Sequence, residues 1–170
     1  MNSVDTHRVR LLVAALRSGQ YPQARGRLAI LDISRTTIQG FCCLGVACET
    51  AIGNGVGHRI IDGYVFYYSR PDHLNSSDNT ANRHTLPVGI RDWFGFADTN
   101  PMIKVLCSQV PNSHFALLCE DCRSHYGDDR SETCDNRVEV AATDANDTFR
   151  LDLNQIADGF ERMYLENADD

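Results

Sequence analysis

The sequence has little lysine, no long hydrophobic run and no complete catalytic signature, and each shortage excludes a class of protein. The longest apolar run, residues 11–16, is far shorter than the roughly 20 residues that a membrane-spanning helix needs. The first residues lack the basic start and long apolar stretch of a secretory signal. We therefore expect a cytoplasmic protein without membrane association. No glycine-rich phosphate loop, dinucleotide fingerprint, serine elbow or paired-carboxylate motif is present, which disfavours an enzyme.

The charge is unevenly distributed along the chain. The net charge of −7 disfavours non-specific binding to nucleic acid. Residues 1–40 nevertheless hold six arginines against two aspartates, a local charge of +4, so the remainder carries −11. Arginine outnumbers lysine 15 to 1. This excess fits either codon bias in a G+C-rich genome or bidentate recognition of an anionic ligand by guanidinium groups.

Periodic apolar residues predict helices near both ends of the chain. Residues 5–18 place apolar side chains at helical spacing, and Gly19 can end the helix. A second helix should follow residues 41–43, and a short one should start at Pro87. In the last helix, Asp152 and Gln155 fit a capping box. Its expected apolar face consists of Leu153, Ile156, Ala157, Phe160 and Tyr164.

Short apolar runs between turn residues predict the strands. We expect a strand at residues 28–33 and a hairpin at residues 58–68 around Asp62-Gly63, a favoured turn pair. Residues 69–85 should form a long polar loop, and residues 102–107 should pair with 114–119. The 170 residues suit one domain. The predicted fold is α+β, with about three to four helices packed on a small antiparallel sheet.

Four of the seven cysteines fall in the second half of the chain and suggest a zinc site. Cys119 and Cys122 form a Cys-x2-Cys knuckle, which supplies two tetrahedral ligands from one tight turn. His125 and Cys134 complete the predicted ligand set, and Cys107 is the alternative to His125 as the fourth ligand. The other interpretation is that these are free thiols in a loosely packed segment.

The remaining cysteines, Cys42, Cys43 and Cys48, sit among aliphatic residues. Free cysteine is among the residue types most often buried, so core packing is the favoured interpretation. The alternative is a nucleophile activated at a helix start and paired with His58, His73 or His84.

A polar turn after the first helix is a candidate ligand site. Arg17, Tyr21, Gln23 and Arg25 combine an aromatic face, an amide and two guanidinium groups, which suits a nucleotide-type anion. Asn146 and Asp147 are added to this predicted site. The alternatives are a capping turn whose polar groups satisfy one another, and an Asx-type turn before the last helix.

Several segments together resemble a family of small uncharacterised proteins encoded by bacteriophages and prophages. The matching residues are ALRSGQYPQ at 15–23, Gly26, Leu28, FCCLGVAC at 41–48, Leu86-Pro87, WFG at 93–95, Asn146-Asp147 and QIAD at 155–158. The resemblance implies a phage accessory protein acting in the host cytoplasm, and it implies no particular activity. Residues 100–137 are longer than the usual pattern, which predicts an inserted cysteine-bearing hairpin within the single domain 1–170.

These observations favour a non-enzymatic protein that sequesters a small anionic, nucleotide-type ligand such as a host immune signal. A pocket lined by Arg17, Tyr21 and Arg25 would support this function. One alternative is an interaction module that inhibits a host protein, which an exposed apolar patch without a pocket would support. The other is a cysteine-dependent hydrolase or transferase, which would need an activated Cys43 in contact with a histidine.

Overall fold

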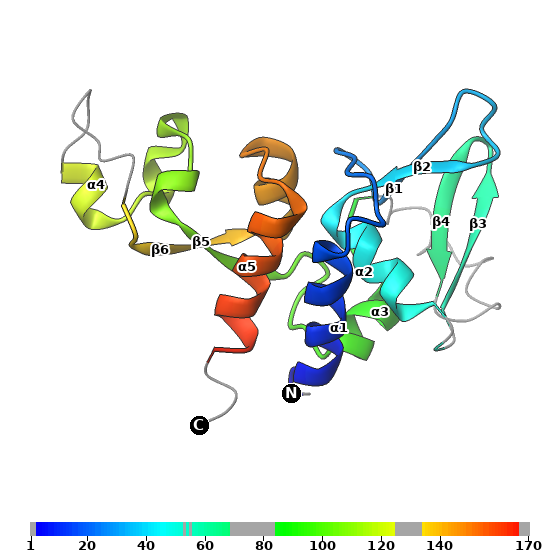
Figure 1. The fold of residues 1–170 in the computed structure, drawn as a ribbon, viewed down its shortest axis with the longest axis horizontal. Coiled ribbons are helices and arrows are strands. Elements are labelled where there is room, and N and C mark those ends of the chain that lie inside the picture. Colours follow the sequence, from blue (N-terminus) through cyan, green and yellow to red (C-terminus); the bar gives the residue numbers. More distant parts are fainter. Residues whose placement is uncertain (1–2, 53, 55, 69–83, 125–133, 167–170) are drawn as a thin grey trace.

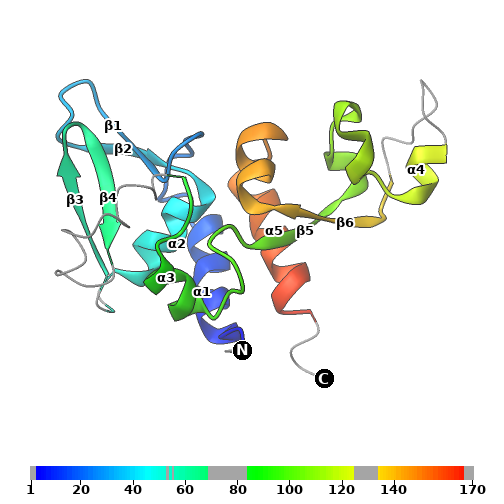
Figure 2. The same cartoon turned by 180° about the vertical axis from the view of Figure 1, so that it is seen from behind.

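Helices α1 (Thr6–Arg17) and α5 (Leu153–Tyr164) pack side by side at the centre of the molecule (Figure 1, Figure 2). The computed structural model describes residues 3–52, 54, 56–68, 84–124 and 134–166. The carboxylate of Asp5 caps α1, and Asp152 and Gln155 form the predicted capping box at the start of α5. The predicted face of α5 is confirmed as the buried face, except that Tyr164 is only partly buried.

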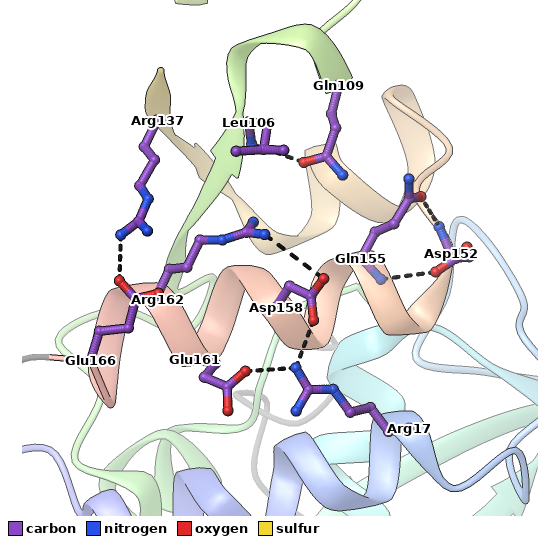
Figure 3. A network of polar contacts seen from close by, with 10 residues as sticks. All are labelled: Arg17, Leu106, Gln109, Arg137, Asp152, Gln155, Asp158, Glu161, Arg162 and Glu166. Carbon is purple, nitrogen blue, oxygen red and sulfur yellow. Dashed lines mark hydrogen bonds and ion pairs between the residues drawn. The ribbon is translucent and has the colours of Figure 1, made fainter. Parts of the chain in front are cut away.

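The polar side of α5 contacts α1 through ion pairs. Arg17 of α1 lies 2.6 Å from a carboxylate oxygen of both Asp158 and Glu161. Figure 3 shows this pair of contacts, together with the longer pair that joins Arg162 to Asp158. The apolar contact between the two helices is therefore bordered by ion pairs on its exposed side.

Helices α2 (Cys43–Ala51) and α3 (Val88–Phe94) complete the core. All but two of the residues of α2 are buried, because the helix is covered by α1, α3 and β2 (Ile38–Phe41). Cys42 caps its start, with Sγ accepting a hydrogen bond from Gly45 N. The largest fully buried side chains of the molecule come from all of these helices and from the strands; they include Phe94, Phe160, Leu12, Leu44 and Ile103.

The described strands form three separate two-stranded antiparallel sheets where we expected one small sheet. β1 (Ala29–Leu31) pairs with β2, and β3 (Gly57–Ile61) pairs with β4 (Tyr64–Tyr68). The predicted turn between β3 and β4 is confirmed, because Asp62 and Gly63 have φ angles of 51° and 77°. Positive φ at both central residues is what a type I′ turn requires. The fold class is α+β, as predicted.

The predicted second hairpin is wrong. β5 (Met102–Leu106) pairs with β6 (Arg137–Ala141), a strand some thirty residues later, and not with residues 114–119. Those residues instead belong to 3₁₀ turns that lead to helix α4 (Glu120–Ser124). A short apolar run does not by itself distinguish a strand from a helical turn, and this run packs its Leu118 into the core.

The two ends of the molecule carry different elements. The β3–β4 hairpin lies at one end, and α4 with the neighbouring 3₁₀ turns lies at the other (Figure 1, Figure 2). Most of the predicted loop at residues 69–85 lies outside the described residues. Within the part of the chain that is described, no helix has the length and apolar character needed to cross a membrane.

Candidate metal centre

Four cysteine thiols meet beyond the end of the β5–β6 pair. Cys107 directly follows β5, Cys119 and Cys122 flank the start of α4, and Cys134 lies shortly before β6. The four Sγ atoms all lie within 4.8 Å of one another, and none of the seven cysteines, all of which are among the described residues, forms a disulfide. These four cysteines can therefore hold one metal ion.

Backbone hydrogen bonds bring the four thiols together. Cys107 N donates to Asn136 O at 2.7 Å, and Ser108 N donates to Cys134 O at 3.4 Å, so the strand pairing of β5 and β6 continues up to the cluster. Gln109 supports the same turn, since its side-chain oxygen accepts from Leu106 N at 2.8 Å (Figure 3). The pairing of two distant strands thus fixes two of the four thiols.

The sulfur atoms also accept hydrogen bonds, as the ligands of a metal site usually do. Cys119 N donates to Cys107 Sγ at 3.3 Å, and Cys122 N donates to Cys119 Sγ at 3.4 Å. The side-chain amide of Asn136 donates to Cys119 Sγ at 3.5 Å. These donors stabilise negative charge on sulfur, which is the form that binds a metal.

The thiol pKa values reflect this crowding. Burial opposes ionisation of Cys119, but hydrogen bonds from Cys122 N, Asn136 and the neighbouring thiols together lower its pKa to about 6. Burial and the bonds with Cys134 and Cys119 raise the pKa of Cys122 to about 12. Among Cys107, Cys119 and Cys122, a low pKa therefore favours the thiolate form at Cys119 alone. A bound cation would favour the thiolate form of all four.

Three of the four residues of the predicted ligand set lie in this cluster. Cys119, Cys122 and Cys134 come together, and the fourth thiol is Cys107, the alternative to His125. His125 itself lies outside the described residues. His114 is engaged elsewhere, because its ring packs on Phe149 with 5.1 Å between the ring centroids.

The predicted anion-site residues separate into two places. Arg17 pairs with Asp158 and Glu161 on α5, whereas Gln23 and Arg25 face the π-helical turn Asp144–Thr148. Tyr21 makes an edge-on contact with Phe41, with ring centroids 5.4 Å apart. Among the cavities recorded for the described residues, none is lined by Arg17, Tyr21 and Arg25 together.

A polar network built on Asn146 joins the turn after α1 to the π-helical turn. Asn146 is completely buried, and its side-chain oxygen accepts from Gln23 Nε2 at 3.0 Å. Its amide nitrogen donates to Ala24 O at 3.0 Å and to the carboxylate of Asp147. Arg25 Nε donates to Asn146 O at 2.9 Å. The polar atoms of this predicted ligand site are thus bound to one another within the protein.

The cysteines of α2 do not have the environment of an activated nucleophile. Cys43 is completely buried, its Sγ donates to Ala142 O at 3.4 Å, and a hydrogen bond with Cys42 together with burial raises the pKa of its thiol. His58 instead lies against Glu49 and Tyr67, and His73 lies outside the described residues. Core packing of Cys42, Cys43 and Cys48 is confirmed.

The structure also contains a cavity whose lining residues the sequence did not predict as a group. Arg27, Arg35 and Tyr64 line a cavity of about 240 Å³ between β1, the loop that follows it and the β3–β4 turn. Both arginines belong to the arginine-rich residues 1–40. The contact of that segment with the distant turn at Gly63 is a tertiary feature with no local signal in the sequence.

Comparison with known proteins adds a family but no activity. A family model described as "Domain of unknown function (DUF8296)" matches residues 7–164. No curated protein and no solved structure matches the chain.

Proposed function

The chain therefore belongs to the family of that domain of unknown function, and we propose that it is a non-enzymatic binding protein stabilised by one structural zinc ion. The observation that supports the zinc ion is the meeting of four thiols from Cys107, Cys119, Cys122 and Cys134 within 4.8 Å. Sulfur-only donor sets of this kind select zinc or an iron–sulfur cluster over hard cations such as magnesium or calcium.

The spacing of the thiols favours a single zinc ion. Zinc–sulfur bonds of about 2.3 Å in a tetrahedron put neighbouring sulfurs about 3.8 Å apart. The Sγ atoms of Cys119 and Cys134 lie 3.7 Å apart, far beyond the roughly 2.05 Å of a disulfide. Four protein ligands would leave no open position for water, which is the arrangement of a structural and not a catalytic zinc site.

Elemental analysis of protein purified under reducing, zinc-replete conditions tests this proposal. We expect about one zinc per chain, and cobalt substitution should give the intense thiolate charge-transfer absorption of a tetrahedral site. Cys122→Ser should lose most of the metal. Cys48→Ala, which removes a buried thiol outside the cluster, should keep it. Protein that holds no stoichiometric zinc, or that holds iron with acid-labile sulfide, would refute the zinc centre.

A second candidate function is the binding and sequestration of a small anionic ligand. It is favoured by the cavity that Arg27 and Arg35 line, both of which belong to the arginine-rich first 40 residues. Removal of a nucleotide-type immune signal of the host is a function that a phage accessory protein could have, so this candidate agrees with the resemblance to phage-encoded proteins. Native mass spectrometry of protein purified from infected cells would reveal a co-purifying ligand, and metal-loaded protein free of any ligand would count against sequestration.

A further inference from the structure

The cavity at the β3–β4 end of the molecule is built by two turns that are far apart in the sequence. Asp32 orders the first turn, since its carboxylate accepts from Ser34 Oγ at 2.6 Å and from Thr36 N at 3.1 Å. Arg35, in the same turn, has a φ of 58°, and its side chain crosses over Gly63 of the second turn. A Cβ at Gly63 would lie 2.8 Å from Arg35 Cδ, so glycine permits this close approach.

An aromatic residue supports the other arginine of the cavity. Tyr64 follows Gly63 directly, and the guanidinium carbon of Arg27 lies 4.7 Å from the centroid of the Tyr64 ring. A guanidinium that stacks on an aromatic face keeps its N–H donors available at its edge. Arg27 is thereby held at the wall of the cavity while its donors stay open to a ligand.

Several arginines of the described residues have a carboxylate partner that the two cavity arginines lack. Arg8, Arg17 and Arg91 are each paired with a carboxylate. For Arg27 and Arg35, by contrast, no carboxylate within 4.0 Å is recorded among the described residues. The carboxylate of Asp32 is occupied by the donors of its own turn. Two guanidinium groups therefore line one cavity together with the carboxylates of Asp32 and Asp62, and within the described part of the chain neither guanidinium forms an ion pair.

We propose that this cavity binds a small phosphate monoester of the nucleoside monophosphate class. Two guanidinium groups supply the forked donors that suit phosphate oxygens. Asp62, which also lines the cavity, supplies an acceptor for a hydroxyl or amino group of the ligand. The volume of about 240 Å³ is below the roughly 300–1,000 Å³ of drug-sized pockets, which limits the ligand to one no larger than a single nucleotide. The proposal rests on the second candidate function and gives it a site.

Isothermal titration calorimetry in phosphate-free buffer tests the site with three probes: adenosine 5′-monophosphate, inorganic phosphate and adenosine. The mononucleotide should bind more tightly than phosphate, and adenosine should bind more weakly than the mononucleotide. Arg27→Gln and Arg35→Gln should each weaken mononucleotide binding about tenfold or more, because each removes charge-assisted hydrogen bonds. Arg17→Gln, a matched change at a paired arginine elsewhere, should bind like the wild type.

Asp62→Asn tests the contact to the nucleoside part of the ligand separately from the contact to its phosphate. Asparagine tolerates the positive φ of this position, so the turn should be preserved. The variant should bind the mononucleotide more weakly but inorganic phosphate at least as well, since it removes a negative charge. Equal affinity of the wild type for phosphate and mononucleotide would overturn the monoester assignment.

The remaining outcomes distinguish a failure of the proposed site from a failure of the anion-binding function. If the mononucleotide binds but Arg27→Gln and Arg35→Gln bind it like the wild type, this cavity is not the site, while anion binding stands. If correctly folded protein, checked by circular dichroism, gives no heat with either phosphate compound, the site and the anion-binding function both fail. The zinc proposal is unaffected in both cases, because metal content reports on it separately.

Discussion

At the scale of single residues, Asn146 shows that the same set of polar side chains fits both a ligand site and a hydrogen-bond network within the protein. Amide, guanidinium and carboxylate groups in two polar turns suggested a place for an anion. In the folded protein, the side-chain amide of Asn146 is bonded to Gln23, Ala24 and Asp147. Because the sequence does not show that these two turns face each other, it could not distinguish donors awaiting a ligand from donors satisfied within the chain.

Replacing Asn146 should therefore cost stability whether or not a ligand is bound. Asn146→Ala removes the side-chain donor to the buried carbonyl of Ala24, at about 1–3 kcal/mol, and leaves the amide of Gln23 with only its bond to Leu151 O. Asn154→Ala, an exposed change on α5, should alter the free energy of unfolding by less than about 0.5 kcal/mol. Urea unfolding followed by circular dichroism measures both. Equal midpoints for the two variants would show that the network does not hold the turns together.

The cysteines could be divided correctly from the sequence, because their neighbours differ. Cys42, Cys43 and Cys48 lie among small aliphatic residues and form the core of α2. Cys119 and Cys122 lie in an acidic, polar stretch with knuckle spacing and join the cluster. The choice between Cys107 and His125 as fourth ligand stayed open, because it depends on how β5 continues past its last paired residue.

At the scale of secondary structure, local signals predicted the elements whose partners are local. The periodicity of α1 and α5 and the Asp62-Gly63 turn each specify structure within a few residues, and all three predictions are confirmed. The pairing of β5 with β6 was missed, because the two strands are separated by the whole cysteine segment. Such a non-local pairing depends on tertiary contacts that the period of a single strand does not encode.

Gly45 illustrates an element-level constraint that opposes local propensity. Alanine is a better helix former than glycine by about 1 kcal/mol, so propensity alone predicts that Gly45→Ala stabilises α2. A Cβ at this position would lie 1.7 Å from the carbonyl oxygen of Leu28, next to β1. The helix can approach the strand this closely only with glycine there.

Gly45→Ala should accordingly destabilise the protein by more than about 4 kcal/mol or abolish soluble expression. The matched control is Gly159→Ala on α5, whose new Cβ would lie 2.9 Å from Cδ1 of Ile103, the flexible end of a side chain. That variant should fold and lose much less stability. Thermal unfolding of both compares the two positions, and similar melting temperatures would contradict the tight approach of α2 to Leu28.

At the scale of the whole molecule, three small sheets are distributed around one helical core. The β5–β6 pair packs on α5 and leads to α4 at one end of the molecule (Figure 2). The four-cysteine cluster lies at this end, because Cys119 and Cys122 flank the start of α4. The β3–β4 hairpin and the proposed anion cavity lie at the opposite end. The predicted phage origin and the predicted sequestration of an immune signal stay predictions. The two candidate sites are far enough apart in the fold to be tested one at a time.

Removing metal should loosen one end of the molecule and leave the core folded. The turn at Cys107, Cys119 and Cys122 is held in part by hydrogen bonds to sulfur, and a metal shared by the thiols would add to its stability. Helices α1 and α5 bury their apolar faces against each other at a distance from the cluster. Their stability should depend little on the metal, because their contacts do not pass through it.

Hydrogen exchange with and without a strong chelator, under reducing conditions, measures this directly. The backbone amides of Cys107, Cys119 and Cys122 should lose protection after chelation, and added zinc should restore it. Amides in the middle of α1 and α5 should keep theirs. Cys122→Ser should reproduce the chelated pattern without chelator, whereas Cys48→Ala should not. If chelation instead releases α1 and α5 together with the cluster, the metal is required for the whole fold, and the division into an independent core and a metal-dependent end is wrong.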